Sequence, residues 1–156
     1  MKRLFLPVAV LVSVMSGCAS VPMESTAVSS KAKKFEEPSP DMAGIYIYRK
    51  DTPVGAALKK DVWVDGKCIG ETAKGVFFYH EVEGNKEHTI STESEFSPND
   101  LTINTETGSL YFIEQYLKMG VFVGGAGLEL NNIAEGKQEV SKLEMATQGN
   151  CSATKS

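Results

Sequence analysis

The chain has 156 residues, 20 acidic and 16 basic, and a formal net charge of −4. This length suits one domain with a hydrophobic core, and the acidic balance disfavours nucleic acid as a charge-driven partner. After the N-terminal stretch, no segment approaches the roughly 18 consecutive apolar residues of a transmembrane helix.

The N-terminus has the order of a secretory signal. Lys2 and Arg3 precede an apolar run from Leu4 to Val14, and Met15-Ser16-Gly17-Cys18 follows. Small residues before a single cysteine resemble a bacterial lipobox, in which the thiol takes a diacylglyceryl group and becomes the mature N-terminus. We therefore predict a signal peptide over residues 1–17 and lipidation at Cys18. The alternative is an ordinary secretion signal with a chance cysteine.

Lipidation would attach the protein to a bacterial membrane. Removing residues 1–17 takes away Lys2 and Arg3 and no acidic residue, so the formal charge falls from −4 to −6. Membrane attachment would then come from the acyl chains, since about two or three of them anchor a protein stably. Ala19 follows the cysteine, where inner-membrane lipoproteins commonly carry aspartate. By resemblance to such lipoproteins, we expect the outer membrane, with the domain facing the periplasm.

Residues 18–41 are predicted to be a flexible tether. They include five serines and three prolines and few large apolar residues. Such a segment buries too little apolar surface to offset the entropy lost on ordering. Lys31, Lys33 and Lys34 form a small basic cluster, which we interpret as part of the solvated linker.

From Ala43 onward, short β-branched and aromatic runs alternate with turn residues. The predicted strands cover residues 45–48, 62–64, 67–69, 76–82, 88–93, 101–105 and 110–117, with further short runs near 121–123 and 128–130. Asp65-Gly66 is a strong hairpin turn signal. Seven or eight short strands at regular spacing predict an all-β domain over residues 42–146, an antiparallel β-sandwich.

One short helix is predicted near the C-terminus. Asn132 can cap it, Glu135 lies three residues later as in a capping box, and Ile133, Val140 and Leu143 share one stripe. Gly136 weakens the helix and keeps it short. Residues 147–156 form a polar C-terminal tail.

With Cys18 taken by lipid, Cys68 and Cys151 remain as an even pair in an oxidising compartment. We predict a disulfide between them, which would attach the tail to the domain. Two unpaired thiols are the alternative, with one of them in a mobile tail.

Gly120, Gly124, Gly125 and Gly127 form the sharpest local cluster. The segment lacks the Lys-Ser/Thr of a phosphate loop and the spacing of a dinucleotide fingerprint. We interpret it as a link between strands, where glycine permits positive φ and close backbone approach. A loop that lines a ligand site is the alternative.

We find no signature for a catalytic site, a metal site or a cofactor. Gly-x-Ser-x-Gly is absent, and His80 and His88 lack the third ligand that a metal site needs. Aromatic residues at adjacent strand positions must point to opposite faces, so Tyr46 and Tyr48 face away from Ile45 and Ile47. If that face of the sheet is solvated, an exposed aromatic strip remains for carbohydrate or protein partners.

Four segments carry a resemblance to a known family: Ile45-Tyr46-Ile47-Tyr48-Arg49, Val64-Asp65-Gly66-Lys67 with Ile69-Gly70-Glu71, His88-Thr89-Ile90, and Gly120 to Ala126. Together they resemble a family of bacterial envelope lipoproteins built on a domain of unknown function. That resemblance implies a secreted β-rich domain on a lipid anchor and no reaction. The Val-Asp-Gly hairpin and the His-Thr-Ile strand are also similar to PEGA-type β-sandwich surface modules, which implies a binding or scaffolding role by analogy.

These observations predict a lipid-anchored, non-enzymatic interaction or structural module of the bacterial envelope. The expected partners are the membrane, through the N-terminal lipid, and an envelope protein or peptidoglycan; nucleic acid is not expected. The alternative is a small-ligand or glycan-binding module that uses the glycine-rich loop and exposed aromatic residues.

Overall fold

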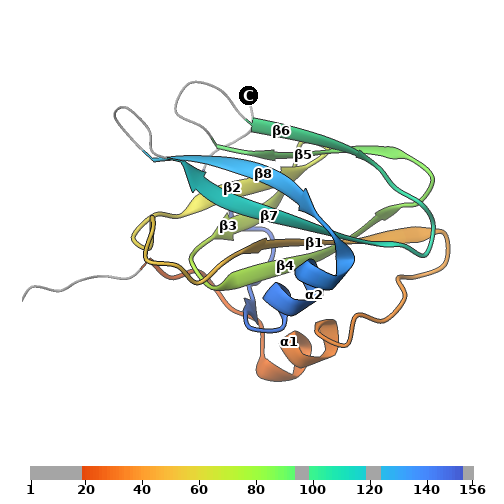
Figure 1. Cartoon of the computed structure of the whole chain (residues 1–156), viewed down its shortest axis with the longest axis horizontal. Helices are drawn as coiled ribbons and strands as arrows, with labels where there is room; N and C mark the ends of the chain where they lie inside the picture. Colours follow the sequence, from red (N-terminus) through yellow and green to blue (C-terminus); the bar gives the residue numbers. More distant parts are fainter. Residues whose placement is uncertain (1–18, 94–98, 119–123, 153–156) are drawn as a thin grey trace, which may run out of the picture.

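The computed structural model describes residues 19–93, 99–118 and 124–152 (Figure 1). Its strands form two packed sheets. The five-stranded sheet has the order β8-β7-β1-β4-β9, built from β1 (Met42–Arg49), β4 (Val76–Glu83), β7 (Leu110–Lys118), β8 (Gly125–Asn131) and β9 (Glu144–Met145). The four-stranded sheet has the order β3-β2-β5-β6, built from β2 (Lys60–Val64), β3 (Lys67–Thr72), β5 (Glu87–Thr92) and β6 (Asn99–Asn104). The helices are α1 (Thr26–Ala32) and α2 (Ile133–Val140).

The main core lies between the two sheets. Ile45 and Ile47 of β1 and Phe78 of β4 meet Val62 and Ile90 from the opposite sheet, and all five are fully buried. These positions alternate along each strand, as the period of two requires. The predicted β-rich, two-sheet fold is therefore confirmed.

The strand pairing is mixed, which corrects the predicted antiparallel sandwich. Strand β1 pairs antiparallel with β4 and parallel with β7, and β4 pairs parallel with the short β9. Parallel neighbours need a long connection, and here the chain passes through the four-stranded sheet between β1 and β7. Local strand and turn signals carry no information on such long-range pairing.

The predicted hairpin at Asp65-Gly66 is confirmed. Both residues have positive φ, 50° and 76°, and Val64 pairs with Lys67 across the turn. A two-residue turn of this kind matches the right-handed twist of the two strands. Asp65 therefore occupies a position that favours a short polar side chain or glycine.

The predicted C-terminal helix is also confirmed, as α2. The Asn132 side chain accepts a hydrogen bond from the Glu135 N–H at 2.9 Å, as expected for a cap. Helices α1 and α2 lie on the outer face of the five-stranded sheet (Figure 1). Within the described residues, neither helix has the length and apolar character needed to cross a membrane.

The outer face of the five-stranded sheet is covered by these helices, so the predicted aromatic strip is buried. Tyr46, Tyr48, Phe77 and Phe112 are at most 1% exposed and pack with Val140, Leu143 and Met145. Phe35, which follows α1, makes edge contacts with the rings of Tyr46 and Phe112, with centroids 5.4 and 5.8 Å away. The strip thus forms a second hydrophobic core.

Residues 26–41 differ from the flexible tether that the composition predicts. Ser25 caps α1 by accepting the Val28 N–H, and Ser29 is buried, with its hydroxyl donating to Glu144. Lys33 donates to the Leu143 carbonyl at 2.8 Å and to Glu144 at 2.9 Å. Two of the polar residues that suggested a linker, Ser29 and Lys33, are therefore bonded to residues more than 100 positions away in sequence, which composition does not reveal.

The C-terminal segment connects the edges of both sheets. Ala146 donates its N–H to the Phe77 carbonyl at 2.9 Å, and Gly149 donates to the Ile69 carbonyl of β3 at 2.8 Å. The predicted disulfide joins Cys68 and Cys151, with Cα atoms 6.1 Å apart. The first residues of the predicted tail are thus bonded along the edge of β3.

Candidate functional site

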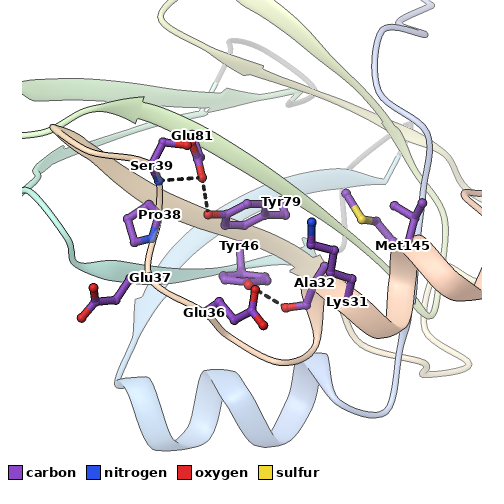
Figure 2. Close-up of a pocket in the computed structure, with 11 residues that line it drawn as sticks. Lys31, Ala32, Glu36, Glu37, Pro38, Ser39, Tyr46, Tyr79, Glu81 and Met145 are labelled. Atoms are coloured by element: carbon purple, nitrogen blue, oxygen red, sulfur yellow. Dashed lines mark hydrogen bonds between the residues drawn. The ribbon is translucent and has the colours of Figure 1, made fainter.

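A pocket of about 410 Å³ opens between α1 and the five-stranded sheet (Figure 2). Its walls come from α1, from the segment 36–39 that follows it, and from β1, β4 and β9. We call it the α1 pocket. It forms only because α1 and the segment after it pack against the sheet, so no local pattern in the sequence indicates it.

Two tyrosines form the floor of the α1 pocket. The Tyr46 and Tyr79 ring centroids are 4.7 Å apart, and the Tyr46 hydroxyl donates to the Ala32 carbonyl at 2.7 Å. Burial, and then the negative charges of Glu36 and Glu81, raise the pKa of Tyr46 to about 12. Tyr46 is only 1% exposed, so the half-buried Tyr79 supplies most of the accessible aromatic surface of the floor.

Glu81 is held at one end of the pocket. Its Oε1 accepts the Ser39 N–H at 3.1 Å and the Tyr79 hydroxyl at 2.9 Å, as Figure 2 shows. Partial burial alone would raise the pKa of Glu81, but the hydrogen bonds from Ser39 and Tyr79 outweigh it and lower the pKa. The carboxylate is therefore ionised and fixed in direction.

The rim of the pocket is mainly acidic. Glu36 and Glu37 are exposed and line it beside Glu81, while Lys31 of α1 lies on the other side. A cation is attracted both to carboxylates and to the face of a tyrosine ring. The combination suits a ligand with a basic or amine group and some apolar surface.

A second, shallower pocket of about 530 Å³ contains both histidines. His88 is buried, with Nδ1 2.7 Å from Asp65 Oδ2 and Nε2 2.8 Å from the Glu83 carbonyl. Asp65 Oδ1 also accepts the Thr89 N–H at 2.9 Å. These contacts link the β2–β3 turn to β5, so the Asp65–His88 pair has a structural role. Asp65 and His88 both belong to segments that carry the family resemblance. That shared membership is the sequence signal that could have indicated their contact.

The described residues contain no group of three or more His, Cys, Asp or Glu side chains placed to bind a metal ion. His80, on β4, lines the same shallow pocket as His88. Burial lowers the pKa of His80 below its ordinary value.

The predicted glycine cluster is described only in part. Gly120, like Cys18, lies outside the described residues. Gly125 and Gly127 belong to β8, and a Cβ at Gly127 would lie 2.5 Å from the Tyr116 ring. Gly127 therefore leaves room for neighbouring side chains within β8, whereas the prediction was a link between strands with positive φ or close backbone approach. A Cβ at Gly124 would lie 2.6 Å from Leu58. Ligand binding by this segment stays a prediction.

Comparison with known proteins identifies relatives of unknown function. A curated "Uncharacterized protein" of Haemophilus influenzae is 55% identical over 132 residues, which cover 85% of this chain and 77% of the relative. No solved structure matches the chain. The family described as "Protein of unknown function (DUF2846)" matches residues 39–126, from the end of the α1 pocket segment into β8. The chain therefore belongs to the DUF2846 family.

Proposed function

We propose that this protein is a lipid-anchored, non-enzymatic interaction module of the bacterial envelope, attached through Cys18 to the outer membrane and facing the periplasm. The order of basic residues, apolar run, small residues and cysteine supports the anchor. The disulfide supports an oxidising compartment.

The α1 pocket carries the binding part of the proposal. Its tyrosine floor, fixed Glu81 carboxylate and acidic rim match a basic side chain presented by an envelope protein. Peptidoglycan, which also carries amine groups, is the alternative partner. The hypothesis of a glycan site on exposed aromatic residues loses its main support, because the helices cover that aromatic face.

Replacing Cys18 tests the anchor. We expect Cys18→Ser to give an unlipidated, uncleaved precursor, because only the thiol accepts the diacylglyceryl group. Cells labelled with radioactive palmitate would show label in the wild-type protein and none in the variant. Label retained by Cys18→Ser would contradict the anchor.

Cross-linking from the rim tests the pocket. A photoreactive amino acid replaces Glu37 in one strain and the exposed Gln138 of α2 in a matched control strain. We expect a discrete protein adduct from position 37 only, and its loss when Glu36→Lys reverses the rim charge.

The identity of the adduct distinguishes an envelope protein from peptidoglycan as the partner. An adduct that digests with muramidase would favour peptidoglycan over a protein. Equal adducts from both positions, or an adduct unaffected by Glu36→Lys, would contradict binding at the α1 pocket.

A further inference from the structure

The folded domain begins very close to the predicted lipid site. Val21 packs against the core between the sheets, and Met23 forms an antiparallel bridge with Ala146. The Thr147 N–H donates to the Pro22 carbonyl at 2.9 Å. Only Ala19 and Ser20 separate Val21 from Cys18, and an extended chain of that length spans about 10 Å. The lipid therefore could not be far from this part of the domain.

Helix α1 continues this surface. The Glu24 N–H donates to the Met145 carbonyl at 2.9 Å, and the Ser29 hydroxyl accepts the Met145 N–H at 3.1 Å. These bonds fix α1 beside β9, at one edge of the five-stranded sheet. We call the exposed side of residues 21–34 the anchor face.

The anchor face combines apolar and basic side chains. Met23 is 44% exposed and Val28 is 43% exposed. Residues 25–35 contain three lysines and no acidic residue, in a chain whose overall charge is negative. Lys33 pairs with Glu144, and Lys31 and Lys34 are exposed. Exposed apolar residues next to lysines are typical of surfaces that contact anionic lipid headgroups.

One acidic residue, Glu24, lies within the range of the anchor face, and the exposed Glu144 lies beside the face and pairs with Lys33. Glu24 precedes α1 and is half-buried, and Glu36 and Glu37 lie beyond it on the rim of the α1 pocket. In Figure 1, α1 lies at the periphery of the molecule, outside the five-stranded sheet. The helix can therefore approach a flat surface while the body of the domain stays behind it.

We propose that the anchor face rests on an anionic bilayer surface, with Met23 and Val28 at headgroup level and Lys31 and Lys34 beside lipid phosphates; the proposal rests on the lipid anchor at Cys18. The domain then has one orientation instead of moving freely on a tether. Val28 and Lys31 also line the α1 pocket, so the pocket opens next to the membrane and receives partners that are themselves held there.

The test uses the full lipidated protein in vesicles of phosphatidylethanolamine and phosphatidylglycerol that contain a headgroup-linked quencher. A fluorescent amino acid is placed at Val28, or at Leu130 as a matched control. Leu130 is also exposed and lies on β8, at the opposite edge of the same sheet. We expect quenching at position 28 to exceed that at position 130 several-fold.

Two variants test whether quenching at position 28 depends on the orientation of the domain and not only on its closeness to the membrane. Lys31→Glu with Lys34→Glu, and a flexible glycine-serine insertion of about 20 residues between Ser20 and Val21, should each reduce quenching at position 28 toward the control value. Mass spectrometry reports the lipid and the intact disulfide in every sample.

The outcomes distinguish the two proposals. A mass without the lipid overturns the anchor and the orientation together. A lipidated protein with equal quenching at both positions overturns the orientation alone. Preferential quenching that neither variant reduces also overturns the orientation, because contact would then not depend on the lysines or on the short connection.

Discussion

At Gly136, packing against the sheet outweighs the low helix propensity of glycine. Gly136 lies in α2, where glycine is unfavourable, yet it is buried against Phe112. A Cβ at this position would overlap the Cβ and ring of Phe112, which belong to a strand in the middle of the sheet. The glycine therefore sets how closely α2 approaches the second hydrophobic core.

We predict that Gly136→Ala destabilises the protein by about 2 kcal/mol. Alanine adds about 1 kcal/mol of helix propensity, but overpacking against Phe112 costs more, up to about 3 kcal/mol. Urea denaturation measures the difference. Gln138→Ala, at an exposed position in the same helix, is the control and should be close to neutral. Stabilisation by Gly136→Ala would show that α2 is not in this close contact.

At the level of elements, α1 depends on a charged contact. Glu144 accepts the Ser29 hydroxyl at 2.7 Å and the Lys33 ammonium at 2.9 Å. The hydrogen bond from Lys33, and then that from Ser29, lower the pKa of Glu144 below its ordinary value of 4.5. Because the folded-state pKa is lowered, this stabilisation is present above pH 4.5 and is lost as the pH falls through the folded-state pKa.

We therefore predict that α1 is held less firmly against the sheet at acidic pH, before the sheets unfold. Hydrogen exchange, corrected for the intrinsic rate at each pH, should show protection of residues 26–32 that begins to fall as the pH is lowered past about 4.5. In Glu144→Gln the protection should be lower at pH 6 and nearly independent of pH. The same pH-dependent decline in both proteins would rule out Glu144 as the cause.

The sequence predicted elements whose signals are local. The Asp65-Gly66 hairpin and the Asn132 cap of α2 each depend on neighbouring residues, and both are confirmed. Strand β9 has only two residues and exists because it lies beside β4. Helix α1 has a local cap signal in Ser25, but its position against the sheet depends on Glu144, which is distant in sequence.

The α1 pocket was missed for the same reason. Its lining comes from a segment that was interpreted as a linker and from aromatic residues that were expected either in the core or on an open face. The pairing of Cys68 with Cys151 was predictable because, once Cys18 is assigned to the lipid, these two cysteines form an even pair in the oxidising compartment that we propose. No pattern in the sequence, however, indicates that residues 21–24 pair with residues 145–147.

For the whole molecule, the disulfide closes a large part of the chain. Cys68 and Cys151 are 83 positions apart, and the tail between Gly149 and Ser152 also bonds to β3 and to buried Asp61. The chain-entropy model gives about 4–5 kcal/mol for a loop of this size, although measured values are often smaller.

We predict that replacing both cysteines with alanine lowers stability by about 2–4 kcal/mol. Hydrogen exchange should increase in residues 147–152 and also in residues 21–24, which bond to residues 145–147 at the start of that segment. The second change is specific, because those residues lie far from the disulfide in sequence. Loss of stability without faster exchange at residues 21–24 would show that the two ends are held independently.

The pairing of residues 21–24 with residues 145–147 also has a consequence for the order of events during export. If the protein is exported from its N-terminus as proposed, residues 145–147 cross the inner membrane after residues 21–24 and after strands β1 to β8. Until then, residues 21–24 lack the partners that they have in the folded domain. An enzyme that modifies and cleaves at Cys18 would therefore meet an accessible strand, and closure of the domain would follow processing.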